Sequence, residues 1–312
     1  MITAEIIADS INQEGDRLTS FILEYPRFVH AEFMTHRMFS KNAASSRAIP
    51  IEKMIQQVID NPAMPVWWGK NQSGMQAKEE LSSCKIYART GHIFPDKFEW
   101  TEKEWAQKIW LDARDEAINS VKRLNEIGLH KQIANRILEP WFNIRVICSA
   151  TDYENFFALR VHEDAQPEIR ELATKMLEAY NNSTPRKLNV GEWHIPFGDK
   201  IDEQKIATLF NNKKIKFVYP YGDGSADIRE IKKKIAIARC ARVSYFSYEG
   251  KDDYEADIKL CDRLFGNIPR HLSPTEHVAQ ALDNSEYIGN FRGFKQYRKF
   301  FSDENLKDSR VK

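Results

Sequence analysis

The stretch Thr35-His36-Arg37-Met38-Phe39-Ser40-Lys41-Asn42-Ala43-Ala44-Ser45-Ser46-Arg47 holds the densest polar chemistry of the chain. Its arginines offer rigid forks of donors that match phosphate and carboxylate groups. Its serine hydroxyls and loop amides would complete an anion-binding cradle. Taken alone, such a stretch is more often a solvated, serine-rich connector after a helix. The sequence around it is needed to decide between these two interpretations.

The elements on either side of this stretch indicate a mixed fold. Pro26 suits the first turn of a helix, so the pattern predicts a helix over 26–39, followed by a loop over 40–50. Polar residues at 12–16 predict a turn between two strands. Helices and strands together predict an α/β fold, with a central sheet flanked by helices. The predicted strands cover 3–9, 18–25 and 142–148, and the other predicted helices cover 50–60, 103–126, 130–138, 152–161, 166–180, 228–240 and 254–265.

Composition narrows the class of protein. The 312 residues include 46 Lys+Arg and 45 Asp+Glu, which gives a net charge of +1 and none of the basic excess typical of polyanion-coating proteins. No apolar run reaches the length of a membrane-spanning helix, and the first residues lack a secretory signal pattern. Four cysteines stand alone, without a CxxC pair, so we expect a cytoplasmic protein with reduced thiols.

Three segments in order give the stretch a more specific interpretation. T-H-R-M-F-S-K-N-A-A-S-S-R resembles the signature R-H-R-x-x-S-x-N-x-x-S-x-R of flavin-dependent thymidylate synthases, with Thr35 in place of the first arginine. Residues 132–140 resemble the A-R-x-x-L-P segment of that family, and residues 155–160 resemble its N-F-x-x-L-R segment. Residues 162–169 continue the resemblance. The family fold is therefore expected, with residues 61–103 and 181–235 as insertions.

A fourth resemblance lies out of order. Residues 273–277, S-P-T-E-H, are similar to a [ST]-P-x-E-H turn that precedes the signature in the family, and residues 238–245 are similar to the opening A-A-R-x-S-Y strand of the family. This order predicts a circularly permuted member. The expected organisation is a core over 1–180, an elaboration or linker over 181–235, and a segment over 236–312 that resembles the N-terminal part of the family.

The resemblance also implies an activity. Family members transfer a one-carbon unit from methylenetetrahydrofolate to C5 of dUMP, with FAD reduced by NADPH, and the flavin supplies the hard step. They are homotetramers with active sites shared between subunits. We therefore expect a FAD-dependent methyltransferase of dTMP biosynthesis that takes a pyrimidine deoxynucleotide monophosphate, with no membrane or nucleic-acid partner and no metal.

Individual roles follow from the aligned positions. Arg160 would face the pyrimidine and stabilise developing negative charge, which is the usual large catalytic effect. The resemblance implies nucleotide contacts from Glu32, Ser45, Arg47, Arg136 and Arg160. It implies flavin contacts from His36, Arg37, Asn42, Ser149, Thr151 and Asn155, with His277 beside the flavin or the folate.

Each of these residues also has a purely structural alternative. Arg160 would pair with Glu163 or Asp164 at the surface, and Asn155 would solvate the start of a helix. Arg136 would interact with the end of the preceding helix, and His277 would be a core histidine.

Departures from the signature leave the substrate open. Thr35, Ala43 and Ala48 replace family residues that contact the nucleotide or flavin, and Glu32 replaces a glutamine. A carboxylate accepts from an exocyclic amine but does not donate, so Glu32 favours a cytosine-type nucleotide as an alternative to uracil. A hydroxymethylating reaction and a nucleotide-binding protein without turnover are the other variants.

Two other classes of protein are alternatives. A metal hydrolase would use the grouped residues 162–164 and Glu168, although no H-E-x-x-H spacing occurs. A nucleic-acid-binding protein would use basic runs interleaved with aromatic residues. These basic residues lie at 213–216, 232–234, 292, 295, 298 and 299.

Overall fold

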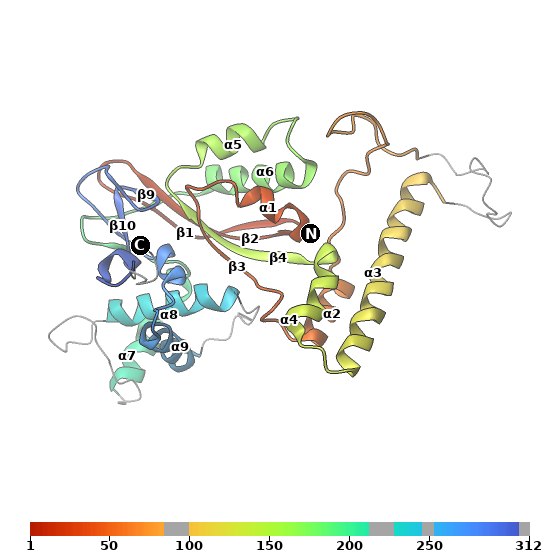
Figure 1. Ribbon diagram of the computed structural model, residues 1–312. Helices are drawn as coiled ribbons and strands as arrows, with labels where there is room; N and C mark the ends of the chain where they lie inside the picture. The colour runs from red at the N-terminus through yellow and green to blue at the C-terminus, as the bar shows by residue number, and fades with distance from the viewer. Residues whose placement is uncertain (84–99, 212–227, 245–252, 306–312) are drawn as a thin grey trace, which may run out of the picture.

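A computed structural model describes residues 1–83, 100–211, 228–244 and 253–305 of the chain. Its centre is a five-stranded sheet in the order β3-β4-β2-β1-β5, antiparallel except for the parallel pair β1 and β5 (Figure 1). The predicted α/β class with a central sheet flanked by helices is confirmed. The strands of this sheet are β1 (Thr3–Ile11), β2 (Arg17–Pro26), β3 (Ser40–Ala43), β4 (Asn143–Ala150) and β5 (Arg186–Lys187).

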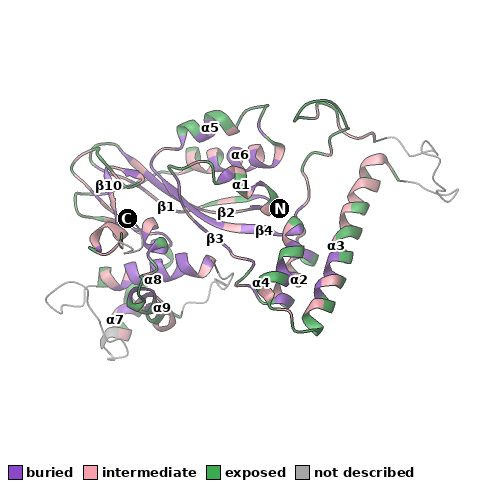
Figure 2. Ribbon diagram, in the orientation of Figure 1, coloured by how far each residue is buried: buried purple, intermediate pink, exposed green. Residues whose placement is uncertain are grey.

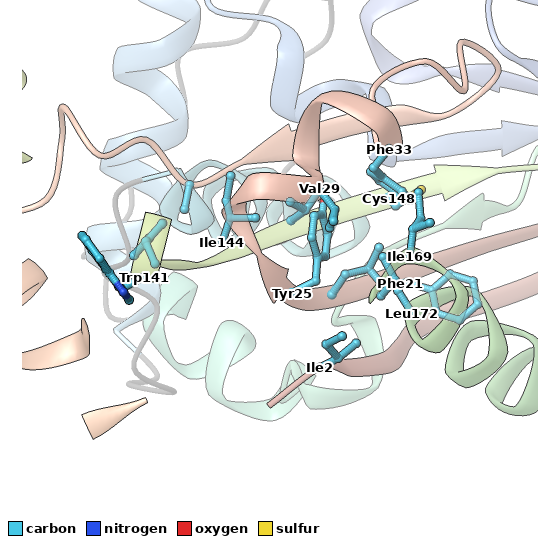
Figure 3. Packing of buried hydrophobic residues seen from close by; sticks show 14 of the residues in the cluster. Ile2, Phe21, Tyr25, Val29, Phe33, Trp141, Ile144, Cys148, Ile169 and Leu172 are labelled. Carbon is cyan, nitrogen blue, oxygen red and sulfur yellow. The ribbon is translucent and has the colours of Figure 1, made fainter. Parts of the chain in front are cut away.

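Side chains along a strand point alternately to opposite faces of the sheet. Helices pack against both of these faces. On one face Phe21 and Cys148 pack with Leu172 of α6 (Pro167–Asn182) in the largest apolar cluster, part of which Figure 3 shows. On the other face Ile147 packs against Cys240 of α8 (Ile228–Val243). Figure 2 shows the central strands as largely buried. Each large side chain buried in this way contributes about 1.5–3 kcal/mol.

The long predicted helix over 103–126 is confirmed as α3 (Glu102–Glu126). Thr101 accepts from the backbone N–H of Glu104, whose side chain accepts from the backbone of Thr101, and this reciprocal capping fixes where the helix begins. Gly128, at φ +79°, supplies the left-handed turn that ends it. The other helices of this half are η1 (Arg27–Val29), α1 (His30–Phe33), α2 (Ile51–Asp60), α4 (Lys131–Ala134), η2 (Asn135–Trp141) and α5 (Glu154–Arg160).

The predicted helix over 26–39 and loop over 40–50 are wrong in part. The helix ends at Phe33, and the ammonium of Lys41 folds back to donate to the carbonyls of Phe33, Met34 and His36, at and just after the end of this helix. Residues 40–43 form the edge strand β3 rather than a loop, because they pair with β4, about a hundred positions away. The predicted helix over 130–138 tightens into the 3₁₀ turn η2 after four residues.

The remaining chain packs against the second face and one end of the sheet (Figure 1). Its helices share a second apolar cluster, and its short strands form a three-stranded sheet, β10-β7-β6, and the pair β8-β9. The predicted turn at 12–16 is confirmed and anchors this part, since Asn12 donates to the carbonyl of Gly293 and Asp16 pairs with Arg292. These elements are β6 (Trp193–His194), η3 (Gly198–Lys200), α7 (Glu203–Asn211), α9 (Tyr254–Gly266), η4 (Ser273–His277), β7 (Ala279–Ala281), β8 (Tyr287–Ile288), β9 (Phe291–Arg292), β10 (Phe294–Gln296) and η5 (Tyr297–Phe300).

Candidate active site

Arg160, the last residue of α5, joins two segments that are far apart in the sequence. Its Nη1 donates to Oε1 of Glu32, and its Nε donates to Nε2 of His36 at 3.0 Å. The apolar side of α5 holds it in place, since Phe156 is buried against Phe33 and Phe39. The surface pairing of Arg160 with its helix neighbours is therefore wrong, and Glu32, His36 and Arg160 form one cluster.

His36 is neutral in this cluster. Burial, followed by the charges of Arg160 and Lys41, lowers its pKa to about 4. Because Nε2 accepts from Arg160, the ring hydrogen belongs on Nδ1, which leaves Nδ1 as a donor. The ring stacks on Phe39 with centroids 5.8 Å apart. Its position is thereby fixed by packing and by a hydrogen bond.

A cavity of about 880 Å³ opens beside the cluster. Glu32, Arg160 and Arg170 line it together with residues of the segment around Trp67. This segment is fixed by Glu168, a buried carboxylate on α6 that accepts from the backbone N–H of Val66 at 2.9 Å. The volume lies within the usual range of small-molecule sites.

A second cluster forms at the far end of β3. Glu139 of η2 accepts from the hydroxyl of Ser46 at 2.6 Å and from Nη1 of Arg136 at 2.8 Å, so it ties the loop that contains Ser45 and Arg47 to the segment that contains Arg136. Arg136 therefore pairs within its own helical turn rather than with the preceding helix. Glu139 and Lys41 were missed as organising residues, although both lie inside the segments that resemble the family.

The other predicted flavin contacts are dispersed. Arg37 and Asn155 are exposed, and the N-cap of α5 is Tyr153, so Asn155 does not cap that helix. Asn42 is buried on β3, and the hydroxyl of Thr151 accepts from the backbone N–H of Arg292 at 3.1 Å.

Ser149 and His277 lie in the interior. The hydroxyl of Ser149 bonds to Nδ1 of His277 at 2.9 Å, and both side chains have 0% exposure. This burial agrees with the structural alternative for His277, a core histidine. The turn that lies out of order in the sequence, η4, is brought by this bond directly onto β4.

The cysteines do not offer a nucleophile in the described part of the chain. Cys148, Cys240 and Cys261 are buried free thiols, and burial raises the pKa of Cys148 to about 12. Burial also raises the pKa values of Cys240 and Cys261. Cys84 lies outside the described residues.

Several of the basic residues that a nucleic-acid-binding protein would use form ion pairs with carboxylates. Arg292 pairs with Asp16, Arg298 with Glu276 and Glu304, and Lys234 with Asp262. The run at 213–216 lies outside the described residues.

The described part of the chain contains neither a candidate metal site nor a candidate membrane-spanning helix. No group of three histidine, cysteine or acidic side chains placed to hold a metal occurs among those residues. None of their helices has the length and apolar character needed to cross a bilayer.

The cluster of Arg160, His36 and Glu32 beside the cavity is the candidate active site. Residues 18–186, more than half of the chain, match the family described as thymidylate synthase complementing protein. The chain belongs to this family, as its signature segments predicted. The match includes both clusters and ends before η4.

Individual relatives are more distant. The flavin-dependent thymidylate synthase of Aquifex aeolicus (strain VF5) is 24% identical over 187 residues, which make up 59% of this chain and 52% of that protein. The chain thus spans about half the length of this curated relative. Two solved structures of the UMP/dUMP methylase PolB from Streptomyces cacaoi, bound with 5-Br dUMP and 5-Br UMP, share 16% identity with this chain. They cover 58% of it and 90% and 88% of their own chains, with TM-scores of 0.37 and 0.38.

Proposed function

We propose that this protein transfers a one-carbon unit to C5 of a pyrimidine deoxynucleotide in a flavin-dependent reaction, with dUMP as substrate. The observation that carries the proposal is the convergence of Glu32, His36 and Arg160 in one cluster, of which Glu32 and Arg160 line the cavity. His36 lies in the signature stretch, Glu32 lies just before it, and Arg160 ends the N-F-x-x-L-R-like segment, so two of the segments that resemble the family meet here. Methylenetetrahydrofolate as carbon donor and NADPH as reductant belong to the same proposal.

Arg160 is the proposed catalytic residue. Its guanidinium is half-buried and held from two sides, by a carboxylate and by an imidazole, so it needs little reorganisation to meet charge that develops on a pyrimidine oxygen. A donor fixed in advance stabilises such charge more than a mobile one. The neutral His36 contributes a ring N–H on the other side of the same cluster without adding a second positive charge.

The residues present fit a flavin nucleotide. Arg37 and Arg47 flank β3, both are exposed, and neither pairs with a carboxylate in the described part of the chain. Two such guanidiniums are suited to phosphate oxygens. When bound, the flavin would supply the hydride that completes the methyl group.

A shared site is part of the proposal. Within one chain, Glu32 and Arg160 lie in the first cluster, whereas Ser45, Arg47 and Arg136 lie in the second, at the opposite end of β3. Residues that are all expected to contact one nucleotide are thus divided between two places. A homotetramer, in which the first cluster of one subunit meets the second cluster of another, would reunite them.

The visible absorbance spectrum of the purified protein tests the proposal. It is recorded with and without added FAD, and then with dUMP. We expect flavin bands that remain with the protein through gel filtration and shift when dUMP is added. The proposal would be overturned if the protein retains no flavin and its spectrum does not change when dUMP is added. Nucleotide binding without turnover would then be the better description.

A second candidate substrate is dCMP, which Glu32 favours. Its carboxylate lines the cavity, and only Oε1 is used by Arg160, so the other oxygen can accept from an exocyclic amine. Parallel assays with dUMP and dCMP decide between the two nucleotides. Turnover of dUMP alone would eliminate this candidate.

A further inference from the structure

A chain of hydrogen bonds runs through the interior between the sheet and the elements that cover its second face. The hydroxyl of Ser10 bonds to Nδ1 of His194 at 2.9 Å, and Nε2 of His194 bonds to the hydroxyl of Ser20 at 2.8 Å. Ser20 bonds to Ser149 at 2.5 Å, and Ser149 bonds to Nδ1 of His277 at 2.9 Å. The five side chains come from β1, β6, β2, β4 and η4.

Strand pairing and burial fix the positions of the side chains in this hydrogen-bond chain. Ser20 and Ser149 stand directly opposite each other in the register of β2 and β4, so their hydroxyls share one face of the sheet. Ser10 is 3% exposed and the other four residues are fully buried. Five interior polar groups are costly unless each one is satisfied, and here each link satisfies two of them.

The two ends of the chain differ. Nε2 of His277 is buried and has no hydrogen-bond partner among the described residues. At the other end, Ser10 lines a small cavity of about 50 Å³, together with Asp9 and Lys232. A polar cavity of this size accommodates water, which needs at least about 10–15 Å³.

The chain has two complete arrangements of its hydrogens. In the first, both imidazoles carry hydrogen on Nδ1: His277 donates to Ser149, Ser149 to Ser20, Ser20 to His194, and His194 to Ser10. In the second, both carry hydrogen on Nε2 and every donor and acceptor is exchanged. Mixed arrangements either leave no hydrogen between Ser20 and Ser149 or leave one hydroxyl hydrogen without an acceptor in the chain.

We propose that these five residues form a proton path between Nε2 of His277 and the water-sized cavity at Ser10. A proton that binds Nε2 releases the Nδ1 hydrogen of His277 to Ser149. Ser149 passes its hydrogen to Ser20, and Ser20 passes its own to Nε2 of His194. The Nδ1 hydrogen of His194 moves to Ser10, whose hydrogen leaves to water. One proton enters, one leaves, and the chain passes from its first arrangement to its second.

Both histidines of the path are neutral before and after a proton passes. Burial lowers the pKa values of His194 and His277 to about 3, so both imidazoles are neutral near pH 7. A neutral imidazole keeps one donor and one acceptor, which is what transfer through the ring requires. The path does not depend on the proposed function, because it needs no nucleotide or flavin.

Nitrogen NMR of the full-length protein, with ¹⁵N-labelled histidine and no ligand added, tests the coupling. We expect His194 and His277 to carry their hydrogens on the same ring nitrogen, both on Nδ1 or both on Nε2. Ser20→Ala breaks the link between them and should change the tautomer ratio of His277, although that ring keeps its bond to Ser149. Opposite tautomers in the unchanged protein, or an unchanged His277 in Ser20→Ala, would overturn the proposal.

Two controls separate the path from general disturbance. His30 bonds to Tyr25 at 2.8 Å and is not part of the hydrogen-bond chain, so its signals should not change in Ser20→Ala. Ser183→Ala removes a nearby hydroxyl that bonds to Asp9 at 2.6 Å, and it should leave both coupled histidines unchanged. A change at His277 in Ser183→Ala as large as that in Ser20→Ala would count against the path.

A variant at the exit tests transfer without cutting the interior. Ser10→Ala keeps the links between His194, Ser20, Ser149 and His277 and removes only the terminal hydroxyl. Exchange of the His277 ring hydrogen with solvent should then slow by about tenfold or more, toward the rate set by local unfolding. An unchanged exchange rate in folded Ser10→Ala would show that protons reach His277 by another way and would overturn the proposal.

Discussion

Nη1 of Arg160 donates to Oε1 of Glu32 across 128 positions of sequence. The pair links the C-terminal end of α5 to the segment just before the signature stretch, and both residues line the same cavity. Neither residue is fully buried, since the two side chains are 21% and 27% exposed. Such a pair adds little to stability, so its position beside the cavity is the better explanation for it.

Arg160→Ala should reduce kcat/KM for the nucleotide by about 10²–10³-fold, because it removes a fixed donor aimed at developing charge. Steady-state assays with the flavin-loaded protein measure this. Arg170→Lys is the control, since Arg170 lines the same cavity and its guanidinium donates to the carbonyl of Glu163 rather than to Glu32 or His36. An Arg160→Ala variant with the activity of Arg170→Lys would show that Arg160 has no catalytic role.

Glu32→Gln tests which base the site prefers. The amide can both donate and accept, so it suits the oxygen of uracil, whereas the carboxylate suits the amine of cytosine. We expect the ratio of kcat/KM for dUMP to that for dCMP to rise by about tenfold, since unpaired polar groups in a site cost roughly 1–3 kcal/mol. The two nucleotides are compared in parallel with the same enzyme preparation. An unchanged ratio would mean that Glu32 acts only through Arg160.

Local signals in the sequence account for the helices that were predicted well. Thr101 and Gly128 bracket α3 within the sequence itself, so its ends needed no tertiary information. The edge strand β3 has no such signal. It exists because residues 40–43 pair with β4, and Lys41 in this strand donates back to carbonyls that follow the short helix.

The candidate site could be predicted as a set of residues but not as a geometry. Resemblance to the family identified Glu32, His36 and Arg160, yet nothing in the sequence showed that Arg160 bonds to the other two. The hydrogen-bond chain from Ser10 to His277 was not predicted, because its members are common residues dispersed over five elements. Single serines and histidines become informative only when the fold brings them together.

Cys148→Ala should retain turnover within about twofold, because the flavin rather than a thiol supplies the difficult chemistry. The thiol lies in the core and its pKa is raised to about 12, so it is not a thiolate near pH 7. A small loss of stability, about 1 kcal/mol, is expected from the cavity that the change leaves. Turnover and urea unfolding are measured on the same sample. Loss of turnover in a folded variant would point instead to a thiol-dependent reaction.

Stability should fall as the pH is lowered below about 6.5. The unfolded chain binds protons at His194 and His277 near that pH, whereas the folded chain does not bind them until about pH 3. Each histidine therefore contributes a slope of up to about 1.4 kcal/mol per pH unit, with stability rising as pH rises through this window. Urea unfolding between pH 7.5 and pH 5 measures the slope.

His194→Gln removes one of these groups and should flatten the slope by up to about 1.4 kcal/mol per pH unit, even if the variant is less stable throughout. His162→Gln is the control, because the side chain of His162 is 55% exposed. Equal slopes for His194→Gln and the unchanged protein would show that His194 does not titrate on unfolding.

Mixing two inactive variants tests whether the site is shared between subunits. Arg160→Ala damages the first cluster and Arg136→Ala damages the second. If one nucleotide contacts the first cluster of one subunit and the second cluster of another, co-expression in equal amounts should restore about a quarter of the sites. If both clusters of one chain act on the same nucleotide, every site keeps one defect and no activity returns. Each variant expressed alone gives the baseline, and gel filtration of the mixture establishes that the subunits associate.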